Sequence, residues 1–119
     1  MRNELDKTVR MLCLAFPRTE ELSAHGSANY RIVGGKIFAT YCVNHHGDGR
    51  VAVWCAASKD EQETLVSADP DFFFVPPYVG VGGWIGIRLD RDLDWGVIAS
   101  LIAEGHRFIL AKQGRRRSV

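Results

Sequence analysis

Apolar residues recur at helical spacing near both ends of the chain. Near the N-terminus, apolar residues three or four positions apart are Leu5, Val9, Leu12 and Phe16. Asn3, which can cap a helix, precedes them, and Pro17, which ends one, follows. Near the C-terminus, Asp94 can cap a second run, which comprises Ile98, Leu101, Ile102, Gly105, Phe108 and Ile109. The pattern predicts two amphipathic helices that pack side by side on a sheet.

The middle of the chain has the residue types of β-strands. Three strands are predicted, over Tyr30–Val33, Ile37–Val43 and Val51–Ala57, because these stretches are rich in β-branched and aromatic residues. Gly34-Gly35-Lys36 and the segment 44–50 separate them and supply the glycines that hairpin turns require. These three strands are therefore expected to pair in antiparallel fashion.

The other segments complete a mixed order of elements. Ser58-Lys59-Asp60-Glu61 reads as a capping box that opens a short helix, which an Asp-Pro pair ends. The apolar, proline-rich stretch 71–78 is expected to clamp the edge of the core, and 84–89 to form a further strand. Residues 18–29 are an irregular connection or a short edge strand. The predicted fold is α+β, an antiparallel sheet of four to five strands with helices mainly on one face.

Composition limits the class of protein. At 119 residues the chain has the size of one domain, which we place at 1–113, and the basic end 114–119 is expected to be disordered. The net charge of +1 is smaller than that of most proteins built to grip a phosphate backbone. No apolar run has the length of a membrane span or the pattern of a signal peptide. We expect a cytoplasmic protein with no membrane partner.

The cysteines Cys13, Cys42 and Cys55 form no C-x-x-C pair. If Val43 pairs with Val51, Cys42 and Cys55 point to opposite faces of the sheet, and a slip by one residue leaves them several positions apart. Neither register permits a disulfide. All three are expected to be small, buried, apolar side chains.

Recognisable motifs for catalysis and cofactor binding are missing. The glycine-rich stretch 80–83 departs from the G-x-G-x-x-G template at Ile85 and leads into a strand, so it reads as a linker. The aspartates at 90, 92 and 94 lack the glycine and the glutamate of a calcium loop. We expect no catalytic residue and no cofactor.

A histidine pair is the one candidate for a metal. His45 and His46 lie with Asp48 in a predicted hairpin loop, but neighbouring side chains of an extended segment point apart. An exposed turn is the better interpretation, and we expect no metal.

Short motifs spread along the chain carry a family resemblance. They are Gly34-Gly35-Lys36-Ile37-Phe38-Ala39, Val51 to Cys55 before a capped helix, Pro70-Asp71-Phe72-Phe73, Pro77-Tyr78, Gly83-Trp84 and Leu93-Asp94-Trp95. In their order and spacing the sequence resembles the MmcQ/YjbR family, from Leu12 to Phe108. The resemblance implies a compact domain with an antiparallel sheet, related in shape to frataxin-like and double-wing DNA-binding folds. The family is labelled as DNA-binding on fold similarity, and it supplies no catalytic residues to transfer.

Two functions are therefore expected as alternatives. The first is a non-enzymatic domain that contacts duplex DNA through the sheet and the hairpin wings, with Arg31, Lys36, Arg50, Trp54 and Arg88. Trp54 departs from the family, where a lysine is common, and so removes a positive charge; it is expected to share the less covered face with Phe38. The second is a small-molecule-binding protein or enzyme with a pocket near His25, Tyr30 and the loop Gly80–Gly83. Binding is favoured over catalysis.

Overall fold

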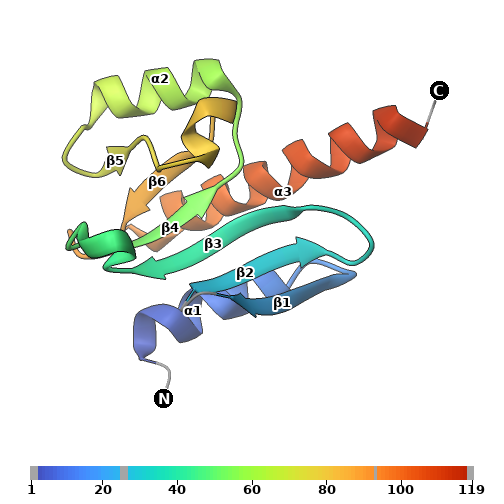
Figure 1. The fold of residues 1–119 in the computed structure, drawn as a ribbon, viewed down its shortest axis with the longest axis horizontal. Coiled ribbons are helices and arrows are strands. Elements are labelled where there is room, and N and C mark those ends of the chain that lie inside the picture. Colours follow the sequence, from blue (N-terminus) through green and yellow to red (C-terminus); the bar gives the residue numbers. More distant parts are fainter. Residues whose placement is uncertain (1–2, 25–26, 93, 118–119) are drawn as a thin grey trace.

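One antiparallel sheet organises the protein. The structure is a computed structural model that describes residues 3–24, 27–92 and 94–117. The strand order is β1-β2-β3-β4-β6-β5, with β1 (Thr19–Ala24), β2 (Ser27–Ile32), β3 (Ile37–Val43), β4 (Val51–Cys55), β5 (Phe73–Phe74) and β6 (Ile85–Arg88). The other elements are α1 (Glu4–Leu14), α2 (Lys59–Ala68), α3 (Trp95–Arg117) and the 3₁₀ turns η1 (His45–Gly47) and η2 (Val79–Gly82). Figure 1 shows α1 and α3 behind the sheet, on one of its faces, and α2 near β5.

The helices begin where the sequence predicts. Asn3 accepts a hydrogen bond at 2.9 Å from the backbone N–H three residues later, and Ser58 does the same at 3.2 Å. Asp94 accepts from the second and third N–H groups after it, at 3.0 and 3.2 Å. Each side chain satisfies a donor that has no partner within its helix. Local sequence therefore sets all three helix starts.

The sheet has six strands, more than the four to five predicted. The segment 18–29 supplies β1 and the start of β2, and the proline-rich stretch supplies β5, which pairs with β6. β5 has only two residues, and Pro76, which follows closely, lacks the N–H that a longer ladder would need. At the end of the chain, α3 continues to Arg117, past the predicted start of the tail at Gly114.

A β-bulge in β3 decides which side chains face α1 and α3. Tyr30 pairs with Ala39 and Arg31 pairs with Ile37, so Phe38 has no partner on β2. The extra residue places Phe38 and Ala39 on the same face of the sheet, where both are fully buried. Ile37 consequently points to the opposite face.

The bulge overturns one expectation about the sheet. Phe38 was expected on the less covered face beside Trp54, but its ring contacts those of Phe16 and His106, at centroid distances of 6.0 and 5.1 Å. Phe38 is therefore a core residue beneath the helices, and Trp54 lies on the other face without it.

Buried residues form one cluster on each face. The larger cluster fills the space between the sheet and α1 and α3, and it includes Val9, Cys13, Tyr30, Phe38, Val53, Cys55, Ile85, Ile87, Ile98 and Ile102. The smaller one comprises Cys42, Ala52, Trp54 and Phe74; we call its side of the sheet the open face. Val43 pairs with Val51, the first of the two registers considered for this hairpin, and all three cysteines are free. Within the described residues, no helix is long and apolar enough to cross a membrane.

Candidate ligand-binding site

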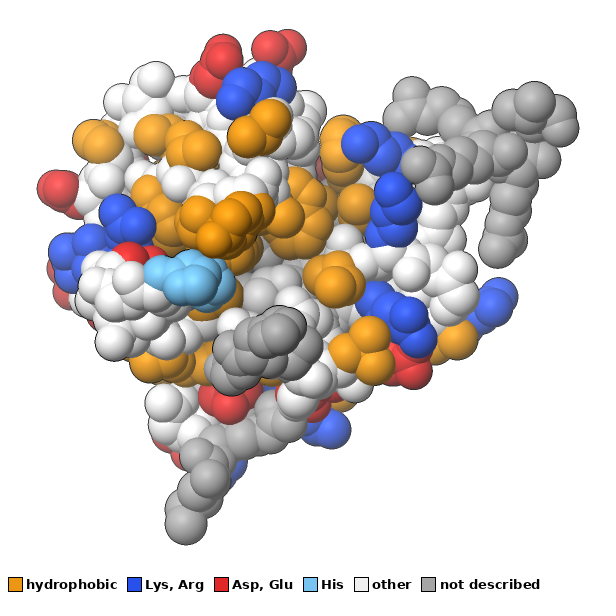
Figure 2. Space-filling view, in the orientation of Figure 1, with side chains coloured by type: hydrophobic (Ala, Val, Ile, Leu, Met, Phe, Trp, Pro, Cys, Tyr) orange, Lys and Arg blue, Asp and Glu red, His pale blue; other side chains and the backbone are white. Residues whose placement is uncertain are grey.

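The open face carries a cavity of about 260 Å³. Its lining comes from β2, β3, β4, η1, η2 and the residue before β6: Ser27, Asn29, Ile37, Thr40, Cys42, His45, Trp54, Val79 and Trp84. These lining residues include no Lys, Arg, Asp or Glu. Figure 2 shows hydrophobic side chains gathered on this face, and Lys and Arg side chains toward its margins. The cavity is thus aromatic and polar, but uncharged.

Trp54 lies at the centre of the open face. Its side chain is 6% exposed, and across the strands it pairs with Thr40 on one side and Gly86 on the other. Gly86 leaves room for the ring of Phe74, which a Cβ at this position would overlap. The guanidinium of Arg50 lies over that ring, 4.1 Å from its centroid. Aromatic side chains therefore cover β4, β6 and β5, whereas β2 and β3 provide the floor of the cavity.

The η2 turn and Trp84 form one wall of the cavity. Gln62 of α2 is 1% exposed, and its Nε2 donates hydrogen bonds to the carbonyl oxygens of Gly80 and Trp84, at 2.8 and 2.7 Å. Gly83, with φ +107°, packs against the backbone at the start of α2. The wall is therefore held by a helix from a different part of the chain.

Two nitrogens at the cavity have no hydrogen-bond partner within the described residues. They are the indole Nε1 of Trp54 and the imidazole Nε2 of His45, both shielded from solvent. The two rings meet edge to face, with 4.8 Å between centroids and planes at 79°. A buried polar group without a partner costs about 1–3 kcal/mol. Such groups are rare in native proteins, and they mark places where water, an ion or a bound molecule supplies the partner.

Strained backbone occurs beside the same cavity. Four described non-glycine residues have a positive φ, and three of them, Asn44, His46 and Tyr78, are chain neighbours of the lining residues His45 and Val79. Tyr78 has φ +64° and ψ −70°, is 75% exposed, and holds its hydroxyl 3.5 Å from the Nε2 of His46. Each such residue costs of order 1–3 kcal/mol, and they cluster at functional sites. Strain therefore points to the same place as the unpartnered nitrogens.

The floor of the cavity carries neutral polar groups. Thr40 Oγ1 donates a hydrogen bond to Asn29 Oδ1 at 2.8 Å, and the hydroxyl of Ser27 donates to Cys42 Sγ at 3.8 Å. Burial raises the pKa of the Cys42 thiol to about 11, although the bond from Ser27 opposes this shift. The thiol is therefore neutral at physiological pH and is a poor nucleophile.

The three thiols are expected to react slowly in the folded protein. Burial raises the pKa of Cys13 to about 12, of Cys42 to about 11, and of Cys55 well above its usual range. At pH 8 the thiolate fraction of Cys42 is about 100-fold below that of an ordinary cysteine. In the folded protein the thiols should react with an aromatic disulfide reagent at least about 100-fold more slowly than in the urea-unfolded protein. In urea all three should react at the same time. Fast reaction of any one of these thiols in the folded protein would contradict their burial.

Three of the four basic residues in the DNA hypothesis, the arginines, each lie beside a carboxylate. Arg31 binds Glu20 at 2.6 Å. Arg88 makes two hydrogen bonds of 2.9 Å to Asp90, which raise the pKa of Arg88 and lower that of Asp90. Arg50, which lies over a phenylalanine ring, is also 3.8 Å from a carboxylate oxygen in its own hairpin. These arginines are therefore engaged within the protein.

The predicted DNA contacts are also spread out. β2, which carries Arg31, and β6, which carries Arg88, are three strands apart, a spacing of roughly 14 Å. Lys36 lies in a separate small cleft beside α3, with Lys112 and Gln113. Trp54 lies on the open face, but buried. The structure thus brings Arg50 and Arg88 to one side of the cavity and leaves Arg31 and Lys36 elsewhere.

The residues of the alternative pocket separate in the same way. Tyr30 is fully buried in the larger cluster, between the sheet and the helices, away from the open face. His25 lies outside the described residues. The loop Gly80–Gly83 does adjoin the open-face cavity, through η2. Sequence reasoning missed Thr40 and Cys42 as cavity residues, because alternation along a strand was the signal they gave for this role. It also missed Trp84, which it had noted as part of a family motif.

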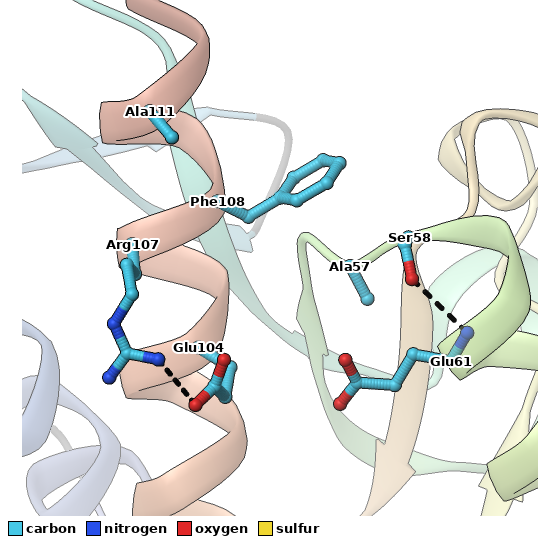
Figure 3. Close-up of a pocket in the computed structure, with 7 residues that line it drawn as sticks. All are labelled: Ala57, Ser58, Glu61, Glu104, Arg107, Phe108 and Ala111. Carbon is cyan, nitrogen blue, oxygen red and sulfur yellow. Dashed lines mark hydrogen bonds and ion pairs between the residues drawn. The ribbon is translucent and has the colours of Figure 1, made fainter. Parts of the chain in front are cut away.

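A second cavity, of about 230 Å³, lies between α2 and α3. Figure 3 shows Ser58 and Glu61 on one side of it, and Glu104, Arg107 and Phe108 on the other. Arg107 pairs with Glu104 along α3. None of the described side chains here has a buried polar atom without a partner. It is therefore the weaker candidate.

The fold and the site together define a small α+β domain with helices on one face of an antiparallel sheet and an uncharged cavity on the other. The sequence model of the family described as YjbR matches residues 14–108. The chain belongs to the YjbR family, as its resemblance to MmcQ/YjbR proteins predicts. A search of curated proteins found no match.

A solved structure has the same fold. The crystal structure of the Deinococcus radiodurans protein DR2400, with a domain of the family DUF419, matches with a TM-score of 0.68. The sequences are 13% identical, and the match covers 82% of this chain and 72% of that chain. At this identity the likeness shows the fold alone.

Proposed function

We propose that this YjbR-family domain binds a small, uncharged molecule in the cavity of the open face. The observation that carries the proposal is the coincidence of an aromatic, uncharged cavity with unpartnered buried nitrogens and strained backbone at its side. Strained residues and unpaired polar groups both lower stability, so their presence at one cavity is explained if a ligand compensates for them.

The size of the cavity limits what it can hold. Sites for drug-sized ligands have volumes of roughly 300–1,000 Å³, and this cavity has about 260 Å³. Charged molecules are poor candidates because the lining contains no Lys, Arg, Asp or Glu, and burying an unpaired charge is costly. The expected ligand is therefore a neutral molecule of one or two rings.

Duplex DNA, bound through Arg31, Lys36, Arg50, Trp54 and Arg88, is the second candidate. The observation in its favour is the presence of Lys and Arg side chains at the margins of the open face (Figure 2). Against it, phosphate would have to replace the carboxylate partners of the arginines, and the net charge is only +1. Small-molecule binding therefore has the stronger support.

Filling the cavity is expected to abolish ligand binding. Val79 lines the cavity and is half-buried, whereas Val81 on the same turn is 87% exposed. Val79→Trp should weaken any ligand found by an NMR fragment screen at least tenfold, because the indole takes up the ligand's space. Val81→Trp is the matched control and should leave affinity unchanged. Backbone amide spectra of both variants would report whether the fold is retained.

The same screen can contradict the proposal. If no neutral fragment shifts the amide signals of Thr40, Trp54 or Trp84, the cavity is not a binding site. A labelled duplex, titrated from low to physiological salt, tests the second candidate. Saturable binding at physiological salt that Arg50→Ala and Arg88→Ala both weaken would favour DNA.

A further inference from the structure

We infer that the ligand of the open-face cavity is a planar heterocycle with an amide-type edge, in which a ring carbonyl adjoins a ring N–H. The inference rests on the proposed binding function and names its ligand class. Its basis is the set of hydrogen-bonding groups that the cavity holds without a partner, together with the arrangement of its aromatic rings.

The aromatic rings favour a flat ligand. Trp54, Trp84 and His45 all line the cavity, and the planes of Trp54 and His45 meet at 79°. A flat ring that stacks on one of two perpendicular rings turns its edge toward the other, an arrangement that aromatic quadrupoles favour. Stacking alone tolerates any flat ring, so the edge of the ligand decides specificity.

The cavity offers the ligand both a hydrogen-bond donor and an acceptor. The indole Nε1–H of Trp54 is a donor only, and it has no partner. Thr40 Oγ1 gives its proton to Asn29 at 2.8 Å, so its lone pairs are left to accept. Trp54 and Thr40 are directly paired across the strands, and side chains in such pairs start about 5 Å apart. A carbonyl next to a ring N–H matches this donor and acceptor.

His45 completes the match and controls access. Its Nε2 donates or accepts according to the tautomer, so it can bond to a second polar atom of the heterocycle. Both unpartnered nitrogens are shielded from solvent, and the His45 ring packs against the indole of Trp54. Contact between the ligand and these nitrogens therefore requires the His45 ring to rotate. The positive φ values of Asn44 and His46, on either side, show that the backbone here is strained.

Uracil is a suitable probe because it is neutral, fits the volume and has two amide edges. 1,3-Dimethyluracil keeps the ring and the carbonyls but has no ring N–H, and orotate adds a carboxylate to the same ring. Titrations followed by the indole N–H signals should show uracil shifting the Trp54 signal. The dimethyl compound and orotate should each bind at least tenfold more weakly than uracil.

Two tryptophan variants test the proposed donor. Trp54→Phe keeps an aromatic ring but loses the N–H, and it should weaken uracil binding at least tenfold. Trp95→Phe is the matched control, because Trp95 lies outside the cavity, and it should bind uracil like the unaltered protein. The comparison of uracil with its dimethyl derivative needs no variant, so it stands even if Trp54→Phe does not fold.

The outcomes separate this inference from the proposed function. If dimethyluracil or benzene shifts the cavity signals as strongly as uracil, the site binds flat molecules without reading an amide edge, and the inference is wrong while the binding function stands. If orotate binds best, the neutral class is wrong. If no compound shifts these signals, both the inference and the proposed function are wrong.

Discussion

Gly83→Ala is expected to lower the free energy of unfolding by about 3 kcal/mol. The φ of +107° costs a residue with a Cβ about 1–2 kcal/mol, and the added Cβ would lie 2.8–2.9 Å from backbone atoms of Ala57, Ser58 and Lys59. Backbone at a helix start cannot move aside cheaply, so overpacking adds about 1–3 kcal/mol. Urea unfolding would measure the loss, and the melting temperature should fall by roughly 10 °C.

The neighbouring glycine provides the control for this substitution. A Cβ at Gly82 meets nothing within 4 Å, so Gly82→Ala should change stability by less than about 1 kcal/mol, in the stabilising direction. Equal losses in the two variants would mean that general flexibility of the turn, and not the contact with α2, is what matters. That result would contradict the role assigned to Gly83.

Gln62→Met is expected to cost about 2 kcal/mol and to weaken ligand binding. Methionine has a similar size, so the main change is the loss of two hydrogen bonds, to the carbonyl oxygens of Gly80 and Trp84. The Gly80 oxygen keeps a bond from Gly83 N at 3.1 Å. An unpaired Trp84 oxygen accounts for most of the expected cost. Urea unfolding and fragment affinity would measure the two effects.

Glu63→Met on the same helix separates this effect from a change in helix propensity. Glu63 is exposed, and such surface changes stay within about 0.5 kcal/mol. If Gln62→Met were equally neutral, the cavity wall would be held by the sheet alone. An affinity loss with unchanged stability would instead mean that the bonds position Trp84 without supporting the fold.

The sequence predicts local structure well where one residue and its near neighbours decide the outcome. Asn3, Ser58 and Asp94 cap helices through side chains that bond to N–H groups two or three residues away. The sequence leaves two registers for β3 and β4, both of which separate Cys42 from Cys55. The structure adopts the one that pairs Val43 with Val51.

Sequence reasoning fails at the bulge in β3. Strict alternation assigns Phe38 and Thr40 to one face, but the extra residue turns Phe38 under the helices and leaves Thr40 on the open face. Whether a strand contains a bulge depends on its partner strand, which lies elsewhere in the sequence. For the same reason the pairing of Arg31 with Glu20 could not be read from the chain.

The sequence by itself determined the family, the α+β class, the helix starts and the separation of Cys42 from Cys55, because these depend on short-range bonding and side-chain periodicity. Only the tertiary structure decided that Val79 and Trp84, on either side of the loop Gly80–Gly83 that Gln62 holds, line one cavity with Trp54 and Thr40. It also decided that the arginines are matched by carboxylates. Such contacts join distant segments, and their geometry exists only once the sheet has formed.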